Sequence, residues 1–208
     1  MMTPSFNYQA IDWSNELWKK MESHWNNLGG NQELNLTEWM RRFTTDITFR
    51  IATGVENDAL TPYYNTFILE NNPLNEKKNE ESDRLIRSLE KFLGGASHYM
   101  IFNKFMRHYV PFVRGKGKNL MKNKDYLFDR IYKIVKERRI EIENTPLDQP
   151  LRQDMLTSCM AANTSRDVNP VKHADANLLT DEEDFGNILD VMLGGADTIN
   201  NIFHFILF

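Results

Sequence analysis

Near the carboxyl end of the chain, two glycines, an alanine, a carboxylate and a hydroxyl follow one another in the run GGADT, residues 194–198. A threonine hydroxyl donates one hydrogen bond and accepts two, so Thr198 could steady an oxygen ligand and pass a proton. A carboxylate in a partly apolar site is biased towards holding a proton, which suits Asp197 to a proton relay. In a helix, Asp190 and Gly194 would share the face of these two residues. The run therefore predicts a proton-transfer site on one helix face.

The surrounding pattern predicts a single long helix over residues 181–208. Thr180 and Glu183 have the spacing of a capping box, and acidic side chains fill the first turn, where the helix dipole favours them. Apolar residues then recur at helical spacing: Ile188, Met192, Ile199, Ile202, Phe203 and Ile206. Each interior glycine costs roughly 1 kcal/mol relative to alanine, so Gly194 and Gly195 should allow a close approach by a neighbouring helix or a flat ligand.

A simpler interpretation of the same residues is structural. Thr198 would then hydrogen-bond back to the carbonyl of Gly194, Asp197 would be solvated, and the two glycines would only permit helix packing.

Residues 194–198 resemble the central-helix signature of the cytochromes P450, which are haem-thiolate monooxygenases. That signature reads Ala or Gly, Gly, any residue, Asp or Glu, Thr, and usually Thr or Ser; Ile199 departs from it at the sixth position. The order of the upstream segments also resembles fungal-type members. The resemblance implies that Gly194 and Gly195 lie on the face towards haem and dioxygen, with Asp190 on the pocket face. It also implies that Thr198 would hydrogen-bond oxygen at the haem and that Asp197 would supply protons.

The single cysteine, Cys159, does not match the family's haem ligand. That ligand lies in a Phe-x-x-Gly-x-Arg-x-Cys-x-Gly loop after the central helix, whereas Cys159 precedes the helix and lacks these neighbours. We expect a buried structural cysteine and no metal ligand in this chain. The family's Glu-x-x-Arg pair also follows the central helix, so Glu38–Arg41 and Glu81–Arg84 are interpreted as surface pairs three residues apart.

The composition and the first residues argue against several classes of protein. A net charge of −4 gives no sign of the strong positive charge typical of nucleic-acid-binding proteins, and a single cysteine excludes a framework of disulfides. The five histidines show no metal-ligand spacing, and His204 is expected to be a packed or capping residue. The first residues do not have the pattern of a signal peptide, and no apolar run is long enough for a membrane span.

The remaining chain predicts helices and no strand. They are expected at about 12–28, 36–53, 75–94, 118–143 and 149–163, with a short one around 63–68. Pro111 should break the aromatic stretch 98–113, and Gly115 and Gly117 should loosen a loop within the basic patch 114–124. This patch is either a solvated loop or, as in membrane-bound family members, a segment near the bilayer and the substrate entrance. Membrane contact is therefore expected near residues 98–124.

Together, these observations predict an all-α chain that forms a single partial domain with part of the cytochrome P450 fold. We expect the helical middle portion of such an enzyme, starting after the family's propionate-binding Trp-x-x-x-Arg and ending within the central helix. The resemblance implies haem, a small organic substrate and an NADPH-dependent reductase, with full-length eukaryotic relatives at the endoplasmic reticulum membrane. The chain alone should be inactive because the axial cysteine is missing. The alternative is a non-catalytic helical interaction module.

Overall fold

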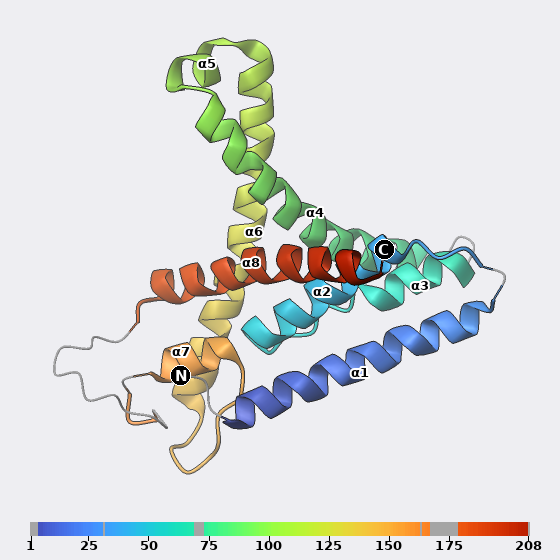
Figure 1. Cartoon of the computed structure of the whole chain (residues 1–208). Helices are drawn as coiled ribbons and strands as arrows, with labels where there is room; N and C mark the ends of the chain where they lie inside the picture. The colour runs from blue at the N-terminus through green and yellow to red at the C-terminus, as the bar shows by residue number, and fades with distance from the viewer. Residues whose placement is uncertain (1–3, 31, 69–72, 163, 167–178, 208) are drawn as a thin grey trace.

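The computed structural model describes residues 4–30, 32–68, 73–162, 164–166 and 179–207. Throughout this part of the chain the regular elements are helices, as the sequence predicts (Figure 1). They are α1 (Pro4–Leu28), α2 (Leu36–Thr53), α3 (Leu60–Ile68), α4 (Pro73–Ile101), α5 (Lys104–Tyr109), α6 (Pro111–Asn144), α7 (Met155–Ala161) and α8 (Asp181–Leu207). Within the described ranges, no helix combines the length and apolar character needed to cross a membrane.

Helix α8 crosses the body of the molecule and packs most extensively on α2 (Figure 1). Its apolar side chains recur every three or four residues and enter a core shared with α2, α4, α6 and α7. The core residues with the least exposure come from all five helices: Phe49, Ala52, Leu85, Leu127, Ile131, Val135, Leu156, Ile188 and Met192. Four other helices therefore fix the orientation of α8 about its own axis.

A second core, rich in aromatic rings, joins α1, α2 and α3. At its centre Trp39 is fully buried, with edge contacts to Trp25 and Tyr63 and a stacked contact to Phe67. Phe203 extends α8 to this cluster through an edge contact with Phe43, at a centroid distance of 6.1 Å. The far half of α8 is therefore held by the second core.

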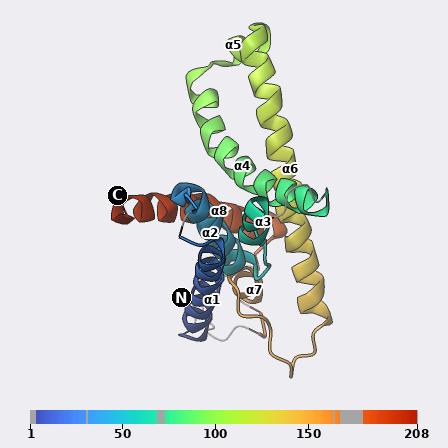
Figure 2. The ribbon, with the colours of Figure 1, turned by 90° about the vertical axis from the view of Figure 1, so that its right-hand side faces the viewer.

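Helices α4, α5 and α6 form an arm that projects from the body, with α5 at its tip (Figures 1 and 2). The two long helices are joined by contact between the Phe92 and Phe128 rings and by a hydrogen bond of 2.9 Å from Asn123 Nδ2 to the Ser88 carbonyl. Gly95 of α4 lies against Leu120 of α6, whose Cδ2 would be 3.0 Å from a Cβ at this position.

The structure corrects one expected break in the arm and confirms another. The loop predicted around Gly115 and Gly117 is wrong, because both glycines lie inside α6. The break expected at Pro111 is confirmed: α5 ends at Tyr109, and Pro111 begins α6, since the first helical position needs no N–H. The helix expected over 149–163 is also too long: α7 covers only Met155–Ala161. Its start is set by Asp154, whose side chain accepts from Thr157 N at 2.8 Å.

Other boundaries differ less. The predicted bounds of α2 are confirmed, with Asn35 as N-cap and Gly54 in the left-handed conformation (φ 68°) at its end. Helix α1 begins eight residues before the expected Asp12, and α4 continues to Ile101, seven residues beyond the expected Gly94.

Candidate functional site

The first turn of α8 is fixed at its start by the predicted capping box. Thr180 N donates to Glu183 Oε2 at 2.8 Å, and Glu183 N donates to Thr180 Oγ1 at 3.3 Å. Hydrogen bonds from the backbone and hydroxyl of Thr180 lower the pKa of the Glu183 carboxyl. From α6, Arg139 donates to Asp184 Oδ2 at 2.8 Å and also bonds Asp181. These contacts tie the beginning of the helix to α6.

Beyond this turn, α8 has one buried and one exposed face. Ile188 and Met192 are 0% and 1% exposed, whereas Asp190, Gly194 and Thr198 are exposed. Asp190, Gly194 and Thr198 therefore share one helix face, as predicted. This face is exposed and points away from the core.

The two glycines have different surroundings. A Cβ at Gly195 would lie 2.8 Å from Thr48 Cγ2 of α2, closer than two carbon atoms can approach without displacement. A Cβ at Gly194 would have no described atom within 4 Å. Close helix packing therefore accounts for Gly195, and Gly194 leaves an open position on the exposed face.

Thr198 shows no sign of the structural role considered above. Within the described residues, its hydroxyl has no hydrogen bond, including none to the Gly194 carbonyl four residues earlier. Two other threonines do make this bond to the carbonyl four residues earlier: Thr53, the last residue of α2, to Phe49 and Thr145, the C-cap of α6, to Glu141, both at 2.7 Å. The Thr198 hydroxyl is thus exposed and available to a ligand.

The side chains of Asp197 and His204 lie outside the described residues, although both backbones belong to α8. The proton-relay role expected of Asp197 stays a prediction, and so does the packing role of His204.

Cys159 lies half-buried on the short helix α7. Burial raises the pKa of its thiol, and the nearby carboxylates of Asp184 and Asp154 raise it further. A thiol held in its protonated form is a poor metal ligand. The part of the chain that the structure describes also holds no group of three or more side chains able to bind a metal ion.

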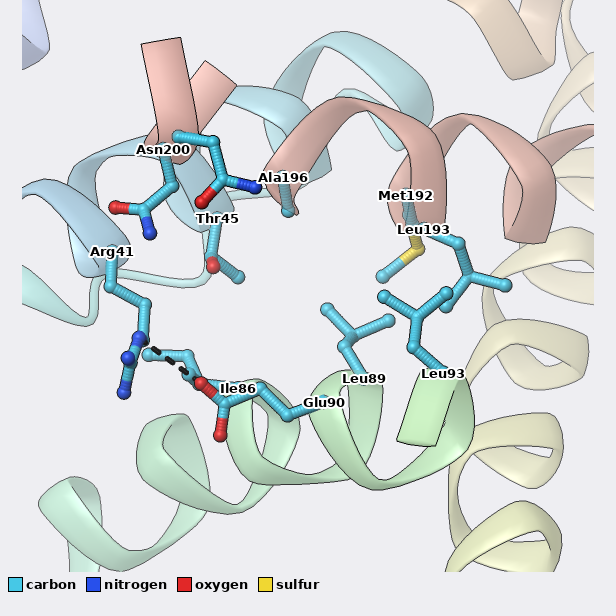
Figure 3. Close-up of a pocket in the computed structure, with 11 residues that line it drawn as sticks. Arg41, Thr45, Ile86, Leu89, Glu90, Leu93, Met192, Leu193, Ala196 and Asn200 are labelled. Carbon is cyan, nitrogen blue, oxygen red and sulfur yellow. Dashed lines mark ion pairs between the residues drawn. The ribbon is translucent and has the colours of Figure 1, made fainter. Parts of the chain in front are cut away.

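A cavity of about 160 Å³ lies between α2, α4 and α8 (Figure 3). At one end Arg41 Nε pairs with Glu90 Oε1 at 3.0 Å, in addition to the predicted pair with Glu38 at 3.1 Å. Thr198 does not line the cavity; the lining residues Met192 and Ala196 lie about 120° and 160° away from it around the helix. Nothing local in the sequence indicates this cavity, because Glu90 lies far from Arg41 along the chain.

The family model described as Cytochrome P450 matches residues 1–208. The chain belongs to the cytochrome P450 family. No curated protein and no solved structure matched it. Cytochrome P450 enzymes are haem-dependent monooxygenases, and the family match supports this function over the interaction module.

Haem is the cofactor that cytochrome P450 enzymes use, and the described residues fit only part of its environment. The exposed face of α8 is a suitable wall, because Gly194 leaves room and Thr198 offers a free hydroxyl. Cys159 does not fit as the axial ligand, because burial and two carboxylates favour its protonated form. The described residues of α8 thus fit the wall of a haem pocket, whereas Cys159 does not fit as the ligand of the iron.

Proposed function

We propose that α8 supplies the oxygen-activating wall of a haem-thiolate monooxygenase that oxidises a small organic substrate. The observation that carries this proposal is the state of the Thr198 hydroxyl. It is exposed, it makes no hydrogen bond to the carbonyl four residues earlier, and it lies near the open position at Gly194. The signature residues and the family match support the same assignment.

Each residue of the exposed face has a distinct task in this proposal. Thr198 Oγ1 donates a hydrogen bond to oxygen in the pocket and accepts one from the group that delivers the proton. Asp197 is the acid that delivers it. Gly194 leaves space for dioxygen and substrate, Gly195 brings the backbone close to α2, and Asp190 lies further along the pocket face. Bound haem supplies the binding and reduction of dioxygen.

The thiolate ligand is assigned to a cysteine other than Cys159, so residues 1–208 by themselves should not catalyse the reaction. The electrons would come from an NADPH-dependent reductase, as the family resemblance implies. Full-length eukaryotic relatives are found at the endoplasmic reticulum membrane, and by the same resemblance the segment 98–124 would contact that membrane.

The test is substitution of Thr198 in a protein that contains this sequence together with a haem-ligating cysteine. Thr198→Ala removes the hydroxyl, whereas Thr198→Ser keeps it and serves as the matched control. General acid assistance typically contributes about 10²–10⁴-fold, so Thr198→Ala should lower product formed per NADPH at least about tenfold and raise hydrogen peroxide release.

Asp197→Asn should slow the same proton delivery while keeping the side-chain volume. Thr198→Ser should couple NADPH use to product formation nearly as well as the wild type. If Thr198→Ala also retains wild-type coupling, Thr198 is only a helix residue and the assignment of the site is wrong.

A further inference from the structure

The cavity between α2, α4 and α8 has a buried floor and an opening to solvent. Four of its lining side chains are at most 5% exposed: Thr45, Ile86, Leu89 and Met192. Three others are exposed and surround the opening: Glu90, Leu93 and Asn201. A small molecule could therefore reach the buried floor from solvent without unfolding any of the three helices.

The lining of this cavity has a polar end and an apolar end (Figure 3). The polar end is formed by two uncharged side chains and one ion pair: Thr45, Asn200 and Arg41–Glu90. The apolar end is formed by two leucines of α4 and a methionine of α8: Leu89, Leu93 and Met192. Such a lining favours a ligand with an apolar body and one polar group.

The hydroxyl of Thr45 is buried at the polar end without a partner. The residue is 4% exposed, and its hydroxyl makes no hydrogen bond within the described part of the chain. Its neighbour Thr44 instead donates to the Arg41 carbonyl at 3.1 Å. Asn200, whose amide can both donate and accept, also has no side-chain hydrogen bond among the described residues. A buried polar group without a partner costs free energy, which a ligand hydroxyl bonded to these side chains would recover.

The polar end carries no unpaired charge. Arg41 pairs with Glu90 at 3.0 Å and with Glu38 at 3.1 Å. An anion would have to displace one of these carboxylates from Arg41, and a cation would have to compete with the guanidinium for Glu90. A neutral hydroxyl group requires neither change, so the polar group of the ligand is expected to be uncharged.

The size of the cavity limits the apolar body to about one aromatic ring. Its volume is about 160 Å³. An apolar cavity of about 150 Å³ is large enough to hold benzene. A ring also suits Met192, because the thioether sulfur of methionine makes favourable contacts with aromatic rings.

We propose that this cavity is a second, non-catalytic ligand site that binds a small neutral phenol, with its ring among the apolar side chains and its hydroxyl bonded to Thr45 and Asn200. The site lies on the side of α8 away from Thr198, so a molecule bound here is not placed for oxidation at the haem face. None of its lining residues has a role in the proposed oxygen chemistry. This site and the assignment of Thr198 can therefore each fail while the other stands.

The experiment titrates the 208-residue chain, labelled with ¹³C at its methionine methyl groups, with phenol, benzene or benzoate. The Met192 signal is identified by its loss in Met192→Leu. Phenol should shift this signal with a Kd on the order of 1 mM, because the ligand has few atoms. The signal of Met21, which is buried in the second core, should stay in place and serves as the internal control.

Matched threonine variants test the polar end. Thr45→Val removes the hydroxyl but keeps the shape of the side chain, so it should weaken phenol binding about threefold to tenfold and leave benzene binding unchanged. Thr48 lies one turn further along α2 and also has a buried hydroxyl without a partner in the described chain, but it does not line the cavity. Thr48→Val should therefore leave both affinities unchanged.

A third variant fills the space itself. Ala196→Leu adds three carbon atoms at a lining position, so it should weaken the binding of both phenol and benzene more than tenfold, and circular dichroism should show that its helices remain. The proposal is overturned if the Met192 signal does not move at up to about 10 mM phenol, or if Met21 moves equally. Benzoate that binds as tightly as phenol, or equal phenol affinities for Thr45→Val and Thr48→Val, would overturn it as well.

Discussion

Gly195 of α8 lies directly against Thr48 of α2. A Cβ at Gly195 would come within 2.8 Å of Thr48 Cγ2 and 3.3 Å of Thr48 Oγ1, at the most extensive helix contact of the fold. Its neighbour Gly194 has open space where a Cβ would be. The two adjacent glycines are thus a natural pair of test and control positions.

Gly195→Ala should destabilise the chain by about 1–3 kcal/mol, because the added methyl group must push α8 away from α2. Gly194→Ala should instead stabilise it by up to about 1 kcal/mol, since alanine favours an exposed helix interior. Urea unfolding followed by circular dichroism measures both changes. Equal effects of the two substitutions would contradict the close contact at Thr48.

Arg138 is a buried cation that joins three segments. Its guanidinium bonds Asp154 Oδ2 at 2.9 Å, Thr157 Oγ1 at 3.1 Å and the Thr53 carbonyl at 2.8 Å. Arg138→Met should cost about 3–5 kcal/mol, because it leaves the Asp154 carboxylate buried and unpaired. The double variant Arg138→Met/Asp154→Asn removes that charge, keeps the side-chain oxygen that caps α7 at Thr157 N, and should recover part of the loss in the same unfolding experiment. A double variant less stable than the single one would argue against an uncompensated charge.

Asp46 should make stability depend on pH. Burial raises the pKa of its carboxyl from 3.8 to about 6, against the opposing hydrogen bonds from Asn57 and Ala59. The folded state therefore favours the protonated acid, and this stabilisation is complete below about pH 4 and lost as pH rises to about 6. The shift corresponds to about 3 kcal/mol.

The measurement is the free energy of unfolding of wild type minus that of Asp46→Asn at several pH values. This difference should fall between pH 4 and 6 and then stay constant. Subtraction is needed because burial also raises the pKa of Asp184 to about 6. A difference that does not change with pH would show that Asp46 titrates near its usual pKa.

Cys159 should not act as a haem thiolate. The chain reconstituted with haem, reduced and treated with carbon monoxide should lack the red-shifted absorption band of a thiolate-ligated haem, because burial and two carboxylates favour the thiol. The Cys159→Ser variant should give the same spectrum as the wild type. A band that appears in the wild type and disappears in Cys159→Ser would restore Cys159 as a ligand.

Local signals in the sequence predicted the helices whose ends depend on their own residues. The Thr180–Glu183 box and the Asn35 and Gly54 caps act within a few residues, so α8 and α2 begin and end close to where they were expected. Gly117 lies inside α6 although its propensity predicted a loop, because a neighbouring helix overrides propensity there: the α4 residue His98 lies close to it. Gly115 has no described atom within 4 Å of a Cβ, and no packing contact explains its place in the helix.

In the candidate site, too, local sequence predicts some features, whereas others depend on residues distant in the sequence. The signature placed Thr198 and Gly194 on one face, and helical periodicity is enough to predict that. The separate role of Gly195 depends on Thr48, and the cavity at Arg41 depends on Glu90; both partners are distant in sequence. Arg114 and Lys118 lie beside α5 because α6 begins at Pro111, which the loop expected around Gly115 did not anticipate.

Helix α6 runs without interruption from the tip of the arm to the end that holds α8. Its 34 residues span about 51 Å, and Arg139 near one end bonds Asp181 and Asp184 in the first turn of α8. Inserting one residue between Lys124 and Arg139 would turn the tip by about 100° and move it about 1.5 Å outward. Insertions and deletions within this stretch of the gene should therefore be tolerated far less well than those in the connection between α6 and α7.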